Sequence, residues 1–257
     1  YTFRNATFLG SASAIAAVSV DTGESFELRL TGGMTMTYAN VTSATQRRLD
    51  VTASSGNITF DGASSWQVNS IMKVVDVNIP YGSSINVNAI GYPGATGPGP
   101  GQNRDRGPGG GGHGGVGGTT RGGSSAGGIV YDDTFRPIDF GSGGGDTTNI
   151  GGQQGGSGGG ALQIQSSGNF TLNGTVSADG GGGSTSGCDG GGGGAGGSVY
   201  VFITTLTGTG NLTAKGGAGS DNCDYDGGGG GGGRIAIYSG DRTGHSGTLS
   251  VTGGAGG

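Results

Sequence analysis

Apolar and polar residues alternate in short stretches along this chain, and no stretch shows the apolar spacing of a helix. In the first ninety residues the alternation is clearest at 26–30, 34–38, 49–51, 58–60 and 75–79. Glycine, proline, asparagine and aspartate separate these stretches, as is typical of turns. The pattern predicts an all-β fold without significant helix, and it leaves residues 1–90 open between a β-sandwich and the first rungs of a β-solenoid.

A longer period governs the C-terminal part of the chain. One set of strand-like segments begins at Ala161, Ser198 and Arg234, and a second set begins at Gly174, Gly210 and Gly247. The steps are 37 and 36 in the first set (198−161, 234−198) and 36 and 37 in the second (210−174, 247−210). Fixed-period self-similarity marks a repeat architecture in which each unit buries its apolar face against its neighbours. We therefore expect a parallel β-solenoid with stacked coils of about 36 residues.

Glycine content divides the chain near residue 90. Of the 69 glycines, 7 precede residue 91 and 62 follow it (69−7). The expected regions are a β-rich region at 1–90, a Gly/Pro-rich segment at 91–160 with an aromatic insert at 129–140, and glycine-rich β repeats at 161–257 that continue beyond the given sequence. Glycine does not hold every third position in the middle region, which excludes a collagen helix.

The glycine runs, such as 190–194 and 227–233, leave two alternatives open. Ordering glycine costs more backbone entropy than ordering any other residue, which favours mobile loops. Alternatively, equally spaced runs adopt the extended threefold helix of polyglycine II and bond laterally into bundles, because glycine retains its N–H.

Charge and hydropathy exclude two classes of partner. The chain has 12 Lys and Arg against 17 acids, a net charge of −5, and no basic stripe, so we expect no nucleic-acid partner. No apolar run approaches the roughly 18–20 residues that span a membrane. The chain begins at Tyr1 and stops within a repeat unit, which suggests a piece of a longer protein.

Six Asn-x-Thr sequons point to secretion. They lie at Asn5, Asn40, Asn57, Asn169, Asn173 and Asn211. Thirteen asparagines, with 53 Ser and Thr in 257 residues, give about two or three sequons by chance (13 × 53/257). Thr-rich strands can also produce sequons passively, but the excess favours N-glycans and an extracellular or cell-surface location.

The two cysteines, Cys188 and Cys223, lie 35 residues apart, almost one repeat (223−188). Equivalent positions of adjacent coils are about 4.8 Å apart, a separation that a disulfide accepts. We expect a bridge between neighbouring coils, which suits an oxidising compartment. Two free thiols or a metal pair are the alternatives.

The repeats resemble a known class of protein. The segments that carry the resemblance are 161–164, 172–180, 194–202, 208–217 and 233–238, and the match covers roughly 125–257. They are similar to very large glycine-rich repeat proteins on the surfaces of bacteria and protists. The resemblance implies secretion, surface display and an adhesive or architectural role, and it supplies no catalytic residues.

Catalytic and metal-binding signals are weak. Asp132, Asp133 and Asp139 form the densest acidic group near aromatic residues, but a solvated loop explains them more simply than catalysis. His113 and His245 have no matching nucleophile, so no triad is indicated. Hence we expect neither an enzyme nor a cofactor.

Residues Asn222, Asp224 and Asp226 fit the first half of a calcium loop. The loop would close with an acid at its twelfth position, which is Gly233, so the site is incomplete.

Three functions remain. The sequence favours a structural subunit of an extracellular filament or coat, whose main partner is a copy of itself stacked head to tail. A cell-surface adhesin or carbohydrate-binding stalk is the alternative, and its aromatic patch would have to come from Tyr131, Phe135 and Phe140. An ice-binding protein is the third, but six sequons argue against a flat face free of glycans.

Overall fold

The computed structural model describes residues 2–3, 6–9, 16–20, 26–43, 46–120, 125–148, 154–186, 189–221 and 225–257. These residues form strands and irregular segments without any helix, so the all-β prediction is confirmed. The strands of the N-terminal region are β1 (Thr2–Phe3), β2 (Ala6–Leu9), β3 (Ala16–Val20), β4 (Phe26–Leu30), β5 (Met34–Thr37), β6 (Ala39–Ser43), β7 (Leu49–Ala53), β8 (Ile58–Asp61), β9 (Ser65–Gln67), β10 (Ser70–Val74), β11 (Val77–Ile79) and β12 (Ser84–Asn86). The later strands are β13 (Ala161–Ser166), β14 (Asn169–Leu172), β15 (Thr175–Ser177), β16 (Thr185–Ser186), β17 (Asp189–Gly190), β18 (Ser198–Thr207), β19 (Asn211–Thr213), β20 (Arg234–Asp241) and β21 (Leu249–Ser250).

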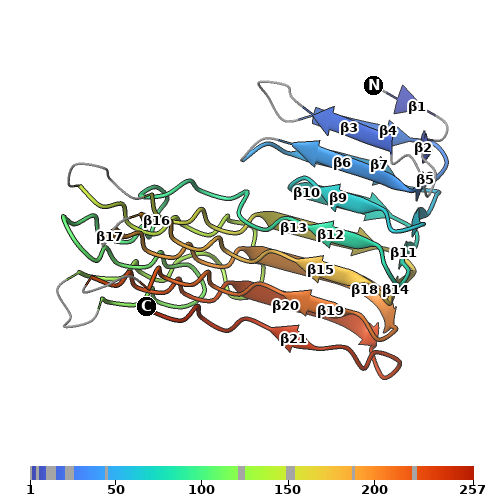
Figure 1. Ribbon diagram of the computed structural model, residues 1–257. Coiled ribbons are helices and arrows are strands. Elements are labelled where there is room, and N and C mark those ends of the chain that lie inside the picture. The colour runs from blue at the N-terminus through green and yellow to red at the C-terminus, as the bar shows by residue number, and fades with distance from the viewer. Residues whose placement is uncertain are drawn as a thin grey trace.

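The strands stack in parallel along one axis (Figure 1). A twelve-stranded sheet has the order β1-β4-β7-β10-β13-β18-β14-β11-β8-β5-β2, with β20 paired to β18. A seven-stranded sheet has the order β21-β19-β15-β12-β9-β6-β3. In residues 26–86 each strand therefore pairs with the strand three elements further along the chain. This arrangement is consistent with a parallel β-solenoid, and both sheets run through residues 1–90 and 161–257 without a break.

The distance along the chain between paired residues changes from one region to the next. Phe26 pairs with Leu49, 23 residues on (49−26), and Val51 pairs with Met72, 21 residues on (72−51). In the glycine-rich region Ala161 pairs with Ser198, 37 residues on, and Ser198 with Arg234, 36 residues on. The extra residues leave the stack as glycine-rich excursions, drawn at the left of Figure 1.

The core consists of apolar columns that run along the stack. In one column the register joins Leu28, Val51, Met72, Ile164, Val201 and Ile237. In another it joins Val41, Trp66, Ile85, Val176, Leu212 and Leu249. Alternate residues of each strand point inward, as the burial pattern of β7 and β8 shows, so each layer covers the apolar residues of the next.

The glycine runs bond laterally with a period of three residues. Run 190–197 donates backbone hydrogen bonds to three neighbouring runs in rotation. The N–H groups of Gly192 and Ala195 donate to the carbonyl oxygens of Gly145 and Ser142, respectively. Those of Gly193 and Gly196 donate to Gly228 and Gly231 of a second run. Those of Gly194 and Gly197 donate to Gly181 and Ala178 of a third, and all six N···O distances are 2.7–3.0 Å. Every third residue thus faces the same neighbour, as in an extended threefold helix.

This lateral packing leaves no room for a side chain at Gly192 or at Gly194. A Cβ on Gly192 would lie 2.0 Å from the carbonyl oxygen of Gly109, and one on Gly194 would lie 2.1 Å from that of Ser157. Real Cβ atoms essentially never approach a heavy atom below 3.0 Å, so the backbones would have to separate. Glycine is therefore required here by contact rather than by backbone conformation.

We expect Gly194→Ala to destabilise the fold by about 1–3 kcal/mol, because the added methyl overpacks a closed site. Gly182→Ala is the matched control, since its Cβ would lie 3.5 Å from the nearest atom, the carbonyl oxygen of Ala218. The control should be neutral or slightly stabilising because alanine restricts the unfolded chain. Thermal unfolding followed by circular dichroism measures both, and equal effects of the two variants would contradict the close packing.

Candidate functional site

A buried contact between His113 and Asp132 fastens the aromatic insert 129–140 to the glycine runs. His113 Nδ1 lies 2.8 Å from the carbonyl oxygen of Gly196, and His113 Nε2 lies 3.1 Å from Asp132 Oδ2. The side chains of His113 and Asp132 are 0% and 2% exposed. The two ring nitrogens thus contact one oxygen atom of the glycine runs and one of the insert.

Asp132 organises the insert around itself. Its carboxylate accepts backbone N–H bonds from Asp133 at 2.7 Å and from Ile138 at 3.1 Å. Burial acts to raise the pKa of Asp132, but the hydrogen bond from His113 and the backbone N–H bonds outweigh burial, so its pKa lies below the usual value. The pKa of Asp139 is raised mainly by its burial and, to a smaller extent, by the negative charge of Asp132. Asp132 is thus an interior anchor and not the solvated loop residue that the sequence suggested.

The neighbouring serine does not complete a catalytic triad. Ser198 Oγ lies 3.0 Å from Asp132 Oδ2 and 2.7 Å from the carbonyl oxygen of Asp139, and Ser198 is fully buried. A triad needs the serine hydroxyl against the histidine ring, whereas here the acid stands between them. The group is built to hold the insert in place, and Arg234 adds to it by donating to the carbonyl oxygen of Tyr131 at 3.0 Å.

Aromatic rings gather beside the insert, on the outer face of β18 and β20. The ring centroids of Tyr200 and Tyr238 are 5.9 Å apart, and those of Phe202 and Tyr238 are 6.5 Å apart. The Tyr238 hydroxyl donates to the carbonyl oxygen of Phe135 at 2.8 Å. We call Tyr200, Phe202, Tyr238 and Phe135 the aromatic patch; Phe202 is 55% and Phe135 74% exposed.

The aromatic patch differs from the one that the sequence suggested. Phe135 belongs to it, but Tyr131 and Phe140 are half-buried and bonded inward. The Tyr131 hydroxyl donates to the carbonyl oxygen of Phe140, and the Phe140 ring packs edge-on against Tyr92. Phe202 and Tyr238 lie one repeat apart (238−202), so aligning the repeats would have found them.

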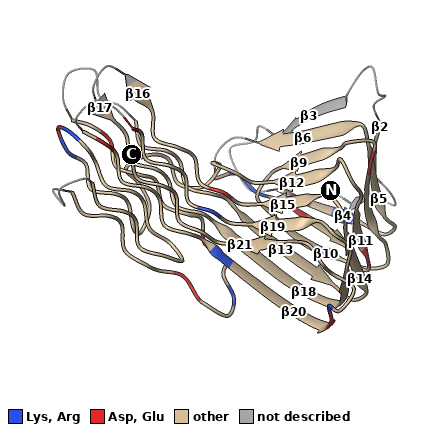
Figure 2. Cartoon of the chain, turned by 60° about the horizontal axis from the view of Figure 1, so that its bottom comes forward, with Lys and Arg blue, Asp and Glu red and all other residues tan. Residues whose placement is uncertain are grey.

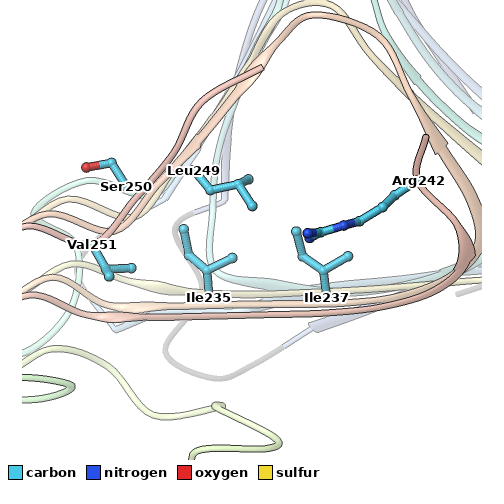
Figure 3. Close-up of a pocket in the computed structure, with 6 residues that line it drawn as sticks. All are labelled: Ile235, Ile237, Arg242, Leu249, Ser250 and Val251. Atoms are coloured by element: carbon cyan, nitrogen blue, oxygen red, sulfur yellow. The ribbon is translucent and has the colours of Figure 1, made fainter. Parts of the chain in front are cut away.

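The last described layer of the stack contains partly exposed apolar side chains. Ile235, Ile237 and Leu249 point into the space between the two sheets, where they line a hollow of about 210 Å³ (Figure 3). Their counterparts one layer earlier, Val199, Val201 and Leu212, are fully buried. By contrast, Leu249 is 42% and Val251 45% exposed.

Arg242 extends over the apolar residues of this last layer and lines the same hollow (Figure 3). Thr205 pairs with Asp241, so Arg242 follows at the position where the preceding layer has the buried Leu206. An inward-pointing charge restricts which strand can pair next to it.

The described sequons lie on the surface of the stack. Asn57, Asn169 and Asn211 are exposed, and Asn40 and Asn173 are half-buried. Asn173 Oδ1 accepts the N–H of Thr209 at 3.2 Å, and Asn211 Oδ1 accepts that of Thr248 at 2.9 Å. These oxygens thus tie one layer to the next, while glycosylation of these residues remains a prediction.

Several expected sites fall outside the described residues. Asn5 and both cysteines, Cys188 and Cys223, are among them, as are the calcium candidates Asn222 and Asp224. Asp226 is described and is 6% exposed. Within the described ranges, no three His, Cys, Asp or Glu side chains are grouped so that they could hold a metal ion.

Charged residues are sparse along the described chain, and Figure 2 shows them as separate short segments. The described part of the chain offers no long apolar helix of the kind that crosses a membrane.

Comparison of the chain with protein-family models, with curated proteins and with solved structures finds no match. The likeness to glycine-rich surface proteins therefore stays a resemblance of sequence pattern.

The His113–Asp132 pair predicts an acid-sensitive insert. A lowered carboxyl pKa contributes stability above the unfolded value of about 3.9, and this contribution is lost as the pH falls through the lower value in the folded protein. Removing one partner of a buried hydrogen bond costs about 1–3 kcal/mol, so we expect Asp132→Asn to loosen the insert at neutral pH. Hydrogen exchange of residues 131–140 between pH 7 and 2 measures this, with the exposed Asp133→Asn as control. Equal protection in Asp132→Asn and wild type at pH 7 would contradict the anchoring role.

Proposed function

We propose that this chain is a non-catalytic structural subunit of a secreted, glycosylated extracellular filament or surface coat. In this proposal the layers form a parallel β-solenoid with coils of about 36 residues in the C-terminal part. The excursions form a bundle of the polyglycine II type, and copies of the chain stack head to tail along the solenoid axis.

The observation that carries the proposal is the parallel register in which each layer covers the one before it, up to the last described layer, which holds Ile235, Ile237, Leu249 and Val251. Equivalent residues elsewhere in the stack are covered by a further layer in the same register. A further layer in the same register, from the continuation of the repeats or from a second copy, would remove these side chains from water, and burial of apolar surface stabilises by roughly 25 cal/mol per Å².

The direction of the strands favours an open assembly. The strand pairs of the two large sheets are all parallel, so the stack has a direction, and the edges that it presents up and down its axis differ. A contact between unlike ends is heterologous and does not close on itself unless the subunits also rotate into a ring. Head-to-tail stacking along a straight axis therefore yields filaments.

Arg242 sets a requirement on the incoming layer. Its guanidinium occupies a column that is apolar in the preceding layers. The incoming copy therefore has to provide a hydrogen-bond acceptor for the guanidinium or leave it accessible to water. A copy with a mismatched end would bury this charge unpaired.

Substitution of the last layer tests the stacking. We expect Ile237→Asp to abolish assembly, because it places a charge inside the contact, while the outward-facing Thr204→Asp leaves it intact. Arg242→Leu should strengthen assembly by removing the desolvation cost of the guanidinium. Sedimentation velocity of the native, unreduced protein measures all three. A wild type that stays monomeric at high concentration would contradict the proposal.

A second function, carbohydrate binding by a surface stalk, is favoured by the aromatic patch. Exposed aromatic rings grouped on one face of a sheet mark interaction sites. We expect Phe202→Ala to weaken the retention of neutral polysaccharides in affinity electrophoresis, whereas Val116→Ala, exposed on a glycine-rich segment, should not. Equal retention of both variants would exclude the patch.

A further inference from the structure

A groove crosses three successive layers at the turn that precedes the seven-stranded sheet. Its volume is about 420 Å³, within the usual range of small-ligand sites. It is lined by Tyr81 and Ser83 before β12, by Asn173 before β15, and by Thr209 and Asn211 at the start of β19. Two of the predicted sequons therefore open into one groove.

Tyr81 stands out among the residues that line this groove. It is 90% exposed, more than any other large hydrophobic side chain of the described chain. The turn that carries it is held by a bond from the Ser83 N–H to the carbonyl oxygen of Pro80, at 3.1 Å. Gly174 fits beneath this turn, because a Cβ there would lie 2.1 Å from the carbonyl oxygen of Ser83. The ring is thus presented to solvent by a closely packed turn beside Asn173.

The hydrogen bonding of Asn173 leaves free the atom that glycosylation uses. Its Oδ1 accepts the Thr209 N–H, which fixes the side-chain amide between two layers. An N-linked sugar is attached through Nδ2, and this atom has no hydrogen-bond partner among the described residues. Ser83 and Thr209 supply hydroxyl groups in the same groove.

We propose that Asn173 carries an N-linked glycan whose innermost sugar lies in this groove and packs its C–H face against the Tyr81 ring. The inference rests on the glycosylation included in the proposed function and adds a defined seat for one glycan. A sugar combines an apolar ring face with hydroxyl groups, and the groove offers an aromatic face and hydroxyl groups in return.

A mutant cycle in a host that performs N-glycosylation tests the seat. Thr175→Val removes the sequon of Asn173, and Thr175→Ser, the matched control, keeps it. Glycopeptide mass spectrometry gives the occupancy of Asn173 in each protein. We expect Tyr81→Ala to lower the folding equilibrium constant by roughly two- to tenfold in the wild type and in Thr175→Ser, and to have no effect in Thr175→Val.

Sugar resonances provide a readout that a merely structural tyrosine would not move. The protons of the Asn173-linked sugar should show upfield ring-current shifts in NMR spectra, and Tyr81→Ala should abolish these shifts. An occupied Asn173 without such shifts, or with equal Tyr81→Ala effects in Thr175→Val and Thr175→Ser, would overturn the seat.

Occupancy also separates this inference from the proposal it rests on. An unglycosylated Asn173 beside other glycosylated sequons would overturn the proposed glycan position and would not contradict the glycosylated filament. Empty sequons throughout would overturn the seat and the glycosylation together, while the sedimentation of the stacking variants would still decide assembly.

Discussion

Lateral hydrogen bonding between backbones without side chains is the constraint on which this structure depends. Each glycine in the middle of run 190–197 bonds to one of three neighbours, and a Cβ on Gly192 or Gly194 would collide with a carbonyl oxygen. Ordering so much glycine is costly in conformational entropy, and the bonds offset this cost only when many runs lie side by side. The stacked strands provide that condition, because they bring equivalent runs back at every layer.

The two halves of the molecule therefore support each other. The strands bury apolar columns that run from Leu28 to Ile237, and their register places the glycine excursions next to one another. His113 and Asp132 join the halves, because the ring contacts Gly196 while the carboxylate holds an insert that lies on β18 and β20. The parallel strands give the described stack a direction, and the filament proposal uses this property.

Much of the fold followed from side-chain alternation. The step of 37 residues from Ala161 to Ser198 could be predicted because the alternating apolar residues that follow Ala161 recur after Ser198. The structure pairs these two residues. The shorter steps before residue 90, such as Phe26 to Leu49, were not visible, since these layers lack the glycine excursion that marks the repeat. The sequence did not decide whether the glycine runs are ordered, because a run of glycine has no alternation of apolar and polar positions. The buried His113–Asp132 pair was missed because its partners meet only through the folded excursions.

The most direct test of head-to-tail stacking is cryo-electron microscopy of the native assemblies at a resolution that separates strands. The account predicts continuous filaments in which strands repeat about every 4.8 Å along the axis, with the first layer of one copy lying on Ile237 and Leu249 of the next. Isolated rods no longer than one chain, or filaments joined through their sides with this layer exposed, would contradict it.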